Sequence, residues 1–111
     1  MRIAYVELPV AGVAGTKAFY QRAFGWSLAD FGPSYAATTT GPVDLGLQGD
    51  AEEATAAPLV CIQTNDVEDA RAAVIAAGGY FTRDIFDFPG GRRFHFSDPA
   101  GNELAVFEEE G

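Results

Sequence analysis

Much of the fold follows from the stretch Gly90-Gly-Arg-Arg-Phe-His-Phe-Ser-Asp-Pro-Ala-Gly-Asn-Glu-Leu-Ala-Val-Phe107, whose pattern predicts two strands joined by a tight turn. The turn, residues 98–101, has Asp first, Pro second and Gly fourth, as a type I turn prefers. Side chains in 93–97 and 102–107 alternate with period two. One face is apolar and should be buried under a helix. The other face carries the only histidine and lines solvent or a pocket. The apolar face holds Phe94, Phe96, Leu104 and Val106, and the mixed face holds Arg93, His95, Ser97, Glu103, Ala105 and Phe107.

The rest of the first half predicts a strand, a helix and three strands. Thr16 is expected to be the N-cap of a helix that ends at Gly25. Its inner stripe would be Phe19, Ala23 and Phe24. The strands are expected at residues 2–10, 26–31, 34–39 and 43–48.

After a small, polar and acidic linker at residues 49–57, the pattern restarts. A strand at 59–64 precedes a helix at 67–77, capped by Asn65 or Asp66. A strand at 80–85, a loop at 86–91 and the hairpin complete the second half. The inner side chains of this helix would be Val67, Ala70, Val74 and Ile75.

The two halves align as a duplicated module. Residues 41–48 match 101–108 without gaps, which pairs Leu45 with Ala105 and Tyr35 with His95; Cys61 matches Glu7. We therefore expect an α+β fold of two βαβββ modules, residues 1–48 and 58–111, in one domain. They would form an open, curved eight-stranded mixed sheet with the mixed faces converging in a trough, the default place for a ligand. The expected trough side chains are Tyr5, Glu7, Tyr35, Cys61, Gln63, His95, Glu103 and Ala105.

Composition limits the classes of partner. The formal net charge of −9 disfavours nucleic acid and anionic membranes, and fits a soluble surface or a cationic ligand. The single cysteine, Cys61, excludes an internal disulfide and a multi-cysteine zinc site. Without a long apolar run or a leader pattern, we expect a cytoplasmic protein with no membrane partner.

The chain resembles a known family. Three segments carry the resemblance: Tyr-Val-Glu-Leu-Pro-Val at 5–10, Lys-Ala-Phe-Tyr-Gln-Arg-Ala-Phe-Gly-Trp at 17–26, and Phe-His-Phe-Ser-Asp-Pro-Ala-Gly-Asn-Glu-Leu-Ala-Val-Phe at 94–107. They are similar to the vicinal oxygen chelate superfamily of glyoxalase I, bleomycin-resistance proteins, fosfomycin-resistance enzymes and extradiol dioxygenases. The resemblance implies paired βαβββ modules, commonly a dimer, and in many members a divalent metal held by His or Glu.

The metal positions implied by the resemblance fall on Tyr5, Leu45, Leu59 and Ala105. Leu and Ala have no donor atom, and transition-metal sites need three or four N, O or S donors. We therefore expect no cofactor and no metal at these positions. A displaced metal site at Glu7, His95 and Glu103 stays open.

Two trough residues are candidate catalytic groups. Glu7 is a general base if it is buried, or else a carboxylate in water or paired with Arg92 or Arg93. His95 is an acid, a hydrogen-bond donor or a metal ligand, or else a satisfied histidine on a half-exposed strand. The candidate ligand-binding residues are Tyr5, Tyr35, Cys61, Gln63, Glu103 and Ala105.

The other trough residues also have two possible roles each, one structural and one functional. Glu103 is expected to pair with His95 across the hairpin. Tyr5 and Tyr35 wall a ligand or belong to the core, and Cys61 is more typical of a small buried hydrophobe than of a nucleophile. Residues 90–93 would be a flexible loop of solvated arginines, or a clamp for an anionic group.

Two function classes remain. One is a metal-free binding protein of the bleomycin-resistance type, which holds a small molecule in the trough. The alternative is a lyase or isomerase of the lactoylglutathione-lyase type that uses Glu7 and His95. Open sheet edges favour a homodimer in either case.

Overall fold

The computed structural model describes residues 1–110 and contains eight strands and two helices. The strands belong to a mixed sheet in the order β2-β3-β4-β1-β5-β8-β7-β6, so the predicted α+β class is confirmed. Gly111, the last residue of the predicted second module, lies outside the described residues. The elements are β1 (Arg2–Pro9), α1 (Val13–Phe24), β2 (Ala29–Asp30), β3 (Tyr35–Ala37), β4 (Asp44–Gln48), β5 (Leu59–Gln63), α2 (Val67–Ala76), β6 (Tyr80–Phe88), β7 (Gly91–Ser97) and β8 (Glu103–Glu109).

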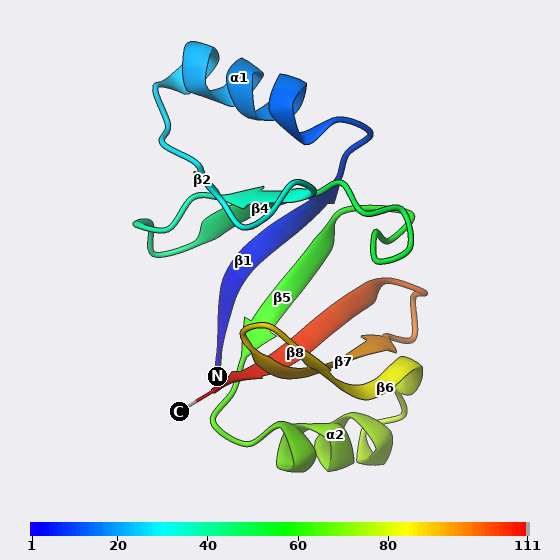
Figure 1. Ribbon diagram of the computed structural model, residues 1–111. Helices are drawn as coiled ribbons and strands as arrows, with labels where there is room; N and C mark the ends of the chain where they lie inside the picture. Colours follow the sequence, from blue (N-terminus) through cyan, green and yellow to red (C-terminus); the bar gives the residue numbers. More distant parts are fainter. Residues whose placement is uncertain (111) are drawn as a thin grey trace. The chain divides into compact units, whose positions relative to one another are not determined.

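The chain divides into two compact units, and each is described by itself (Figure 1). The first unit is Tyr5–Leu59. In it β1 is parallel to β4, and β3 is antiparallel to both β2 and β4. The second unit is the chain from Val60 onward together with Met1–Ala4. In it β5 is parallel to β8, and β7 is antiparallel to both β8 and β6.

The core of the second unit forms on the apolar face of the β7–β8 hairpin, as predicted. Phe94 faces Val106 across the two strands. Both side chains are almost fully buried and contact Val67 and Ala70 of α2. The turn at 98–101 also forms as predicted, because the Gly101 N–H donates to the Asp98 carbonyl at 3.0 Å.

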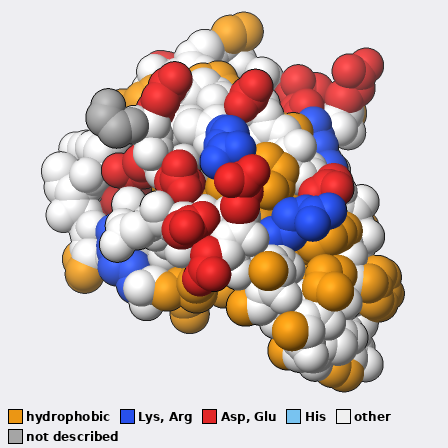
Figure 2. Space-filling model, turned by 90° about the horizontal axis from the view of Figure 1, so that it is seen from below, with side chains coloured by type: hydrophobic (Ala, Val, Ile, Leu, Met, Phe, Trp, Pro, Cys, Tyr) orange, Lys and Arg blue, Asp and Glu red, His pale blue; other side chains and the backbone are white. Residues whose placement is uncertain are grey.

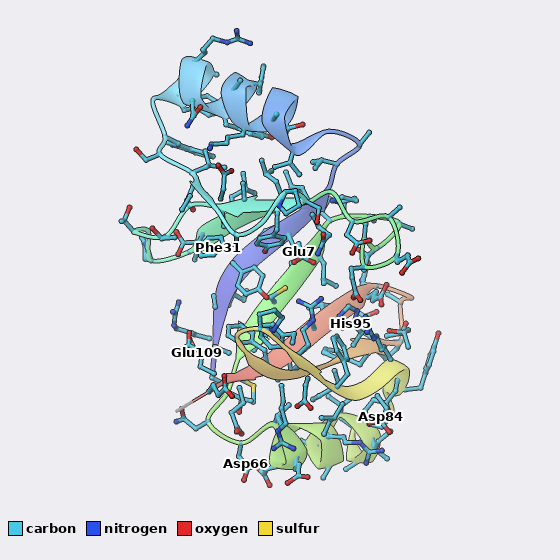
Figure 3. All side chains as sticks on the ribbon, viewed as in Figure 1. Glu7, Phe31, Asp66, Asp84, His95 and Glu109 are labelled. Atoms are coloured by element: carbon cyan, nitrogen blue, oxygen red, sulfur yellow. The ribbon has the colours of Figure 1, made fainter. Side chains whose placement is uncertain are left out.

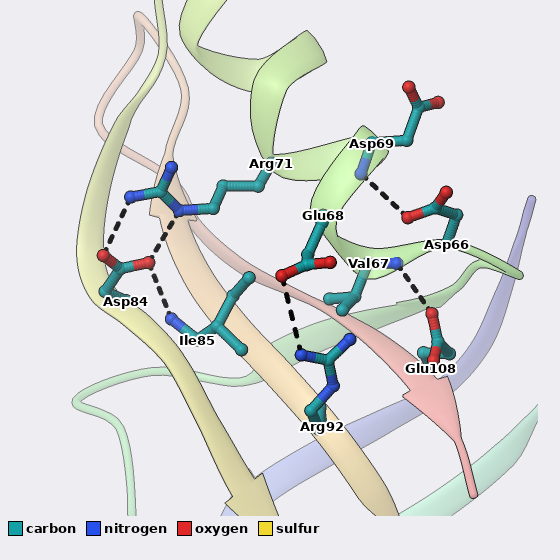
Figure 4. A network of polar contacts seen from close by, with 9 residues as sticks. All are labelled: Asp66, Val67, Glu68, Asp69, Arg71, Asp84, Ile85, Arg92 and Glu108. Atoms are coloured by element: carbon teal, nitrogen blue, oxygen red, sulfur yellow. Dashed lines mark hydrogen bonds and ion pairs between the residues drawn. The ribbon is translucent and has the colours of Figure 1, made fainter.

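Helix α2 is fixed at its start by side-chain caps (Figure 4). Asp66 is the N-cap and accepts a hydrogen bond from the Asp69 N–H. Glu108 of β8 accepts one from the Val67 N–H at 2.9 Å. These bonds satisfy N–H groups that have no partner inside the helix.

A second contact ties α2 to β6. Arg71 donates two hydrogen bonds to the Asp84 carboxylate, at 2.8 and 2.9 Å. This guanidinium lowers the pKa of Asp84 to about 2. The Arg71 side chain also lies along an apolar surface, with its Cζ 4.4 Å from the centre of the Phe81 ring.

Helix α1 differs from the prediction in its start and in its buried side. It begins at Val13 with Gly12 as N-cap, and the Thr16 hydroxyl donates back to the Gly12 carbonyl instead of capping. Phe19 and Phe24 are 55% and 61% exposed. The half-buried positions include Val13, Thr16, Lys17 and Tyr20, a helical stripe that starts earlier than the predicted one. The predicted end at Gly25, with φ of +70°, is confirmed.

Other boundaries also move. β2 and β3 are short, whereas β6 runs on to Phe88 through the residues predicted as a loop. Ile75 is 50% exposed and lies outside the core of α2. No helix within residues 1–110 is long and apolar enough to cross a membrane.

Replacing Phe94 by Ala should lower the free energy of unfolding by about 3–5 kcal/mol, because it opens a cavity in a fully buried cluster. Ile75→Ala is the matched control and should cost far less, since half of that side chain is already in water. Urea unfolding followed by circular dichroism measures both. Equal losses for the two variants would contradict this assignment of the core.

Candidate functional site

The face of the second unit that points away from α2 is buried and partly polar. Parallel pairing of Cys61 with Ala105, and antiparallel pairing of His95 with Ala105, put these three side chains on this face. Gln63, paired with Phe107, shares it. Cys61 and Ala105 are fully buried, and His95 is 3% exposed. The second-unit members of the predicted trough set therefore share a face, and its convergence with the first unit stays a prediction.

A hydrogen-bonded chain of three side chains holds His95 in place. The Nδ1 of His95 lies 3.0 Å from Oε2 of Glu103, the pair predicted from the hairpin. The same carboxylate oxygen accepts a hydrogen bond from the Thr82 hydroxyl at 2.8 Å. Because a carboxylate only accepts, Nδ1 carries the proton in neutral His95, and Nε2 keeps its lone pair.

The Nε2 atom of His95 is the unusual feature of this face. It is buried and has no hydrogen-bond partner among residues 1–110. Burial lowers the pKa of His95 below its ordinary value of 6.5, against the hydrogen bond to Glu103, which raises it. The charges of Arg93 and Arg83 lower it further. His95 is therefore a neutral hydrogen-bond and proton acceptor at neutral pH.

Strand β6 brings further side chains to this face by two irregularities in its pairing. Phe81 pairs with Phe96, Arg83 with His95, and Phe86 with Arg93, so extra residues are inserted on both sides of Arg83. Each insertion reverses the alternation of the strand, which is the usual effect of a β-bulge. Arg83 and Phe86 thus both reach the His95 side, whereas Asp84 bonds to α2 on the opposite side (Figure 3).

Aromatic and guanidinium groups surround the imidazole. The Phe86 ring centre lies 5.8 Å from that of His95. The Cζ atoms of Arg83 and Arg93 lie 3.5 and 5.3 Å from the centre of the Phe86 ring. Arg93 is only 5% exposed and belongs to β7, so the expectation of a loop of solvated arginines at 90–93 is wrong. Arg92 points the other way, with Nη1 3.8 Å from Oε1 of Glu68 (Figure 4).

The first unit presents its own mixed face. Tyr5 pairs with Asp44 and Glu7 with Gly46 on β1 and β4, and Tyr35 is on the same side through its pairing with Gln48. Glu7 is 3% exposed, so it is not a carboxylate in water. The three predicted first-unit residues therefore share a face.

The predicted repeat register needs a correction on β4. Leu45 pairs with Val6, so it lies on the face opposite to Tyr5 and Glu7. Ala105, its predicted match, lies on the His95 face. The residue of β4 that pairs with Glu7 is Gly46. The gapless alignment was one residue out of step because strand pairing, not sequence identity, sets which way a side chain points.

A pocket of about 280 Å³ opens on the first-unit face. Its walls include the rings of Tyr5, Phe31 and Tyr35 and the carboxylate of Asp44. The ring centres of Phe31 and Tyr35 are 6.5 Å apart, with planes at 61°. Two of the predicted ligand-binding residues thus line a cavity.

A model of the Glyoxalase/Bleomycin resistance protein/Dioxygenase superfamily matches residues 2–106, almost the whole chain. The chain belongs to this superfamily. No curated protein sequence matches it significantly.

Solved structures show the same fold at low identity. An NAD-dependent benzaldehyde dehydrogenase from Legionella pneumophila has a TM-score of 0.80 at 18% identity, over 96% of this chain and 98% of that one. A methylmalonyl-CoA epimerase from Mycobacterium tuberculosis has a TM-score of 0.80 at 12% identity, over 99% and 89%. A superfamily member from Vibrio splendidus 12B01 has a TM-score of 0.68 at 16% identity, over 98% of both chains.

The residues present do not fit the metal of the metal-dependent superfamily members. With the register corrected, the four positions implied for the metal are Tyr5, Gly46, Leu59 and Ala105. Only the phenol of Tyr5 is a side-chain donor, whereas transition-metal sites need three or four donors. Residues 1–110 contain no group of three or more His, Cys, Asp or Glu side chains that could hold a metal ion. His95 and Glu103 form a hydrogen-bonded pair, and the displaced site that would add Glu7 of the first unit stays a prediction.

Several site residues were not predicted from the sequence. Arg83 reaches the His95 face only through a bulge in β6, and period-two alternation does not predict bulges. Phe86 was predicted to lie in a loop, and Thr82 is on this face by ordinary alternation but was not singled out as a site residue. Phe31 and Asp44 lie near the ends of elements that the sequence placed less accurately. The Gly32-Pro33 turn, which follows Phe31, was the sequence signal for the end of a strand at this point.

The single histidine makes the His95 assignment measurable by NMR. We expect the imidazole to titrate below 6.5 and to carry its neutral proton on Nδ1. Thr82→Val removes the hydroxyl that donates to Glu103. Without this donor the carboxylate stabilises the imidazolium more strongly, so the pKa of His95 should rise above the wild-type value. Thr82→Ser should restore it. A proton on Nε2 of the neutral ring, or a pKa unchanged in Thr82→Val, would contradict the chain of bonds.

Proposed function

We propose that this superfamily member binds a small molecule on the His95 face, defined here by Arg83, Phe86, Arg93, His95 and Ala105. In this proposal His95 Nε2 accepts a hydrogen bond from the ligand. The aromatic ring of Phe86 and the small Ala105 provide apolar contact beside it.

One observation carries the proposal: the buried Nε2 has no hydrogen-bond partner within residues 1–110, although the other ring nitrogen is bonded. An unsatisfied buried polar atom costs about 1–3 kcal/mol, so folding alone does not favour it. A ligand that donates a hydrogen bond would remove this cost. Functional sites are where such unsatisfied groups are retained.

A second candidate function, proton transfer by a lyase or isomerase, is favoured by the Glu103–His95 pair. A carboxylate on Nδ1 orients the imidazole and stabilises the imidazolium formed when Nε2 takes a proton. His95 would take a proton from carbon next to a carbonyl group, leaving an enolate, and would return it to the same or a neighbouring carbon. Participation of Glu7 in the same site stays a prediction.

A thermal-shift screen of metabolites and antibiotics, followed by variants, tests the proposal. His95→Gln should weaken binding of any hit by about tenfold, the effect of losing one good hydrogen bond. Arg92→Gln, on the same strand but on the α2 side, should leave binding unchanged. Glu7→Gln tests whether Glu7 belongs to the site. A hit whose affinity is the same in His95→Gln and wild type would place binding elsewhere.

The screen also separates the two functions. If each hit is recovered unchanged and only affinity falls in His95→Gln, the protein is a binder. If a hit is converted, or exchanges a carbon-bound proton in D2O, and His95→Gln abolishes this, it is an enzyme. Failure of every compound to raise the melting temperature would count against both functions.

We also propose a homodimer, as the sequence predicted. Strand β6 lies at an end of the strand order, but its two irregularities make it a poor edge for pairing with a second sheet. The exposed rings of α1 and the residues that follow it are a better contact. Phe24 and Trp26 are 61% and 42% exposed, with ring centres 5.1 Å apart. Apolar side chains that gather at a surface are typical of interfaces.

Light scattering at micromolar concentration should give twice the mass of the 11.8 kDa chain. Phe24→Ser should shift the mass toward the monomer, because it removes an apolar contact. Ile75→Ser, at a half-exposed apolar residue of α2, is the control and should leave the dimer intact. A monomeric wild-type protein would overturn the proposal.

A further inference from the structure

A second candidate site lies in the first unit and is built from different residues than the His95 face. Its pocket of about 280 Å³ has three aromatic rings and one carboxylate in its wall, and its lining includes neither lysine nor arginine. All of these residues belong to Tyr5–Leu59. The lining is Tyr5, Phe31, Tyr35, Ala37, Thr38, Thr39, Asp44, Leu45 and Gly46.

The aromatic corner of this pocket depends on Gly46. A Cβ atom at this position would overlap the Tyr35 hydroxyl, so any other residue would force the tyrosine to move. Tyr35 therefore crosses β4 at the position on the Glu7 face where a side chain would otherwise stand. Together with Phe31, whose ring is tilted by 61°, it presents two ring surfaces at an angle.

The carboxylate of Asp44 is held in a fixed orientation beside these rings. Its Oδ1 accepts a hydrogen bond from the Thr38 hydroxyl at 2.8 Å and another from the Gly41 N–H at 3.0 Å. Thr38 Oγ1 in turn accepts from the Leu45 N–H. The carboxylate is thus positioned by the loop between β3 and β4 before any ligand arrives.

Rings and a carboxylate together favour one chemical class of ligand. The faces of aromatic rings carry negative charge density and attract cations, quaternary ammonium groups above all. A carboxylate adds a full negative charge, and the formal net charge of −9 raises the local concentration of cations around the protein. Figure 2 shows this excess on one face, where acidic side chains outnumber the lysines and arginines.

We propose that the pocket of Tyr5, Phe31, Tyr35 and Asp44 binds a small organic cation of the ammonium class. The rings of the pocket contact the substituted ammonium group, and Asp44 supplies the counter-charge. The pocket is built from other residues than the His95 face, so the inference neither requires nor excludes the function proposed above.

Choline and its neutral carbon isostere, 3,3-dimethyl-1-butanol, make a matched pair of probes that differ in charge and not in shape. Titration calorimetry on the wild-type chain should show choline binding at least about tenfold more tightly than the alcohol, a ratio expected from cation–π and charge contacts. Phe31→Leu keeps an apolar side chain but removes a ring, and Asp44→Asn keeps the Oδ1 hydrogen bonds but removes the charge. Each should weaken choline binding by about three- to tenfold.

Two control variants test whether choline binds in this pocket and not elsewhere on the acidic surface. Glu52→Gln changes the net charge by the same amount as Asp44→Asn at an exposed residue outside the pocket, and should leave choline binding unchanged. His95→Gln should also leave it unchanged, so failure here is distinct from failure of the His95 proposal. Equal affinity for the alcohol and choline, wild-type affinity in both pocket variants, or no choline binding at millimolar concentration would each overturn the inference.

Discussion

Burial of Phe94 and Val106 under α2 is the contact on which the rest of the second unit depends. These two side chains face each other across β7 and β8, so their burial selects one register of the hairpin. Because successive side chains of a strand alternate, the same register puts His95 and Ala105 on the opposite face. A slip of one residue would drive the imidazole into the apolar cluster and expose Phe94. The register of the hairpin therefore sets both the core of this unit and its candidate site.

The His95 face shows how polarity is tolerated inside a small protein. The imidazole is kept neutral by burial and by two guanidinium groups, while Glu103 and Thr82 fix which nitrogen carries the proton. The free-energy cost of this arrangement comes from Nε2, which is buried and has no hydrogen-bond partner among the described residues. A structural histidine would be expected to use both nitrogens, and this difference is the physical basis for proposing a ligand.

The superfamily scaffold has been adapted differently in the first unit. At the position of β4 where metal-dependent members would need a donor, Gly46 has no side chain, and Tyr35 lies over it. In place of metal-donor atoms, aromatic rings line the pocket on this face, together with the carboxylate of Asp44. The likeness to distant solved structures shows the fold alone, because one fold can carry faces of different chemistry.

The sequence by itself determined the order of elements, the β7–β8 hairpin, a cap of α2 at Asn65 or Asp66, the Glu103–His95 pair and the face on which each predicted site residue lies. These follow from local alternation and turn preferences, which need no distant partner. Only the tertiary structure decided the buried side of α1, the burial of Arg93, the bulge that turns Arg83 toward His95, and the approach of Tyr35 to Gly46. Each of these depends on which strand lies beside which and in what register, and such contacts between residues far apart in the chain leave no periodic signal in the sequence.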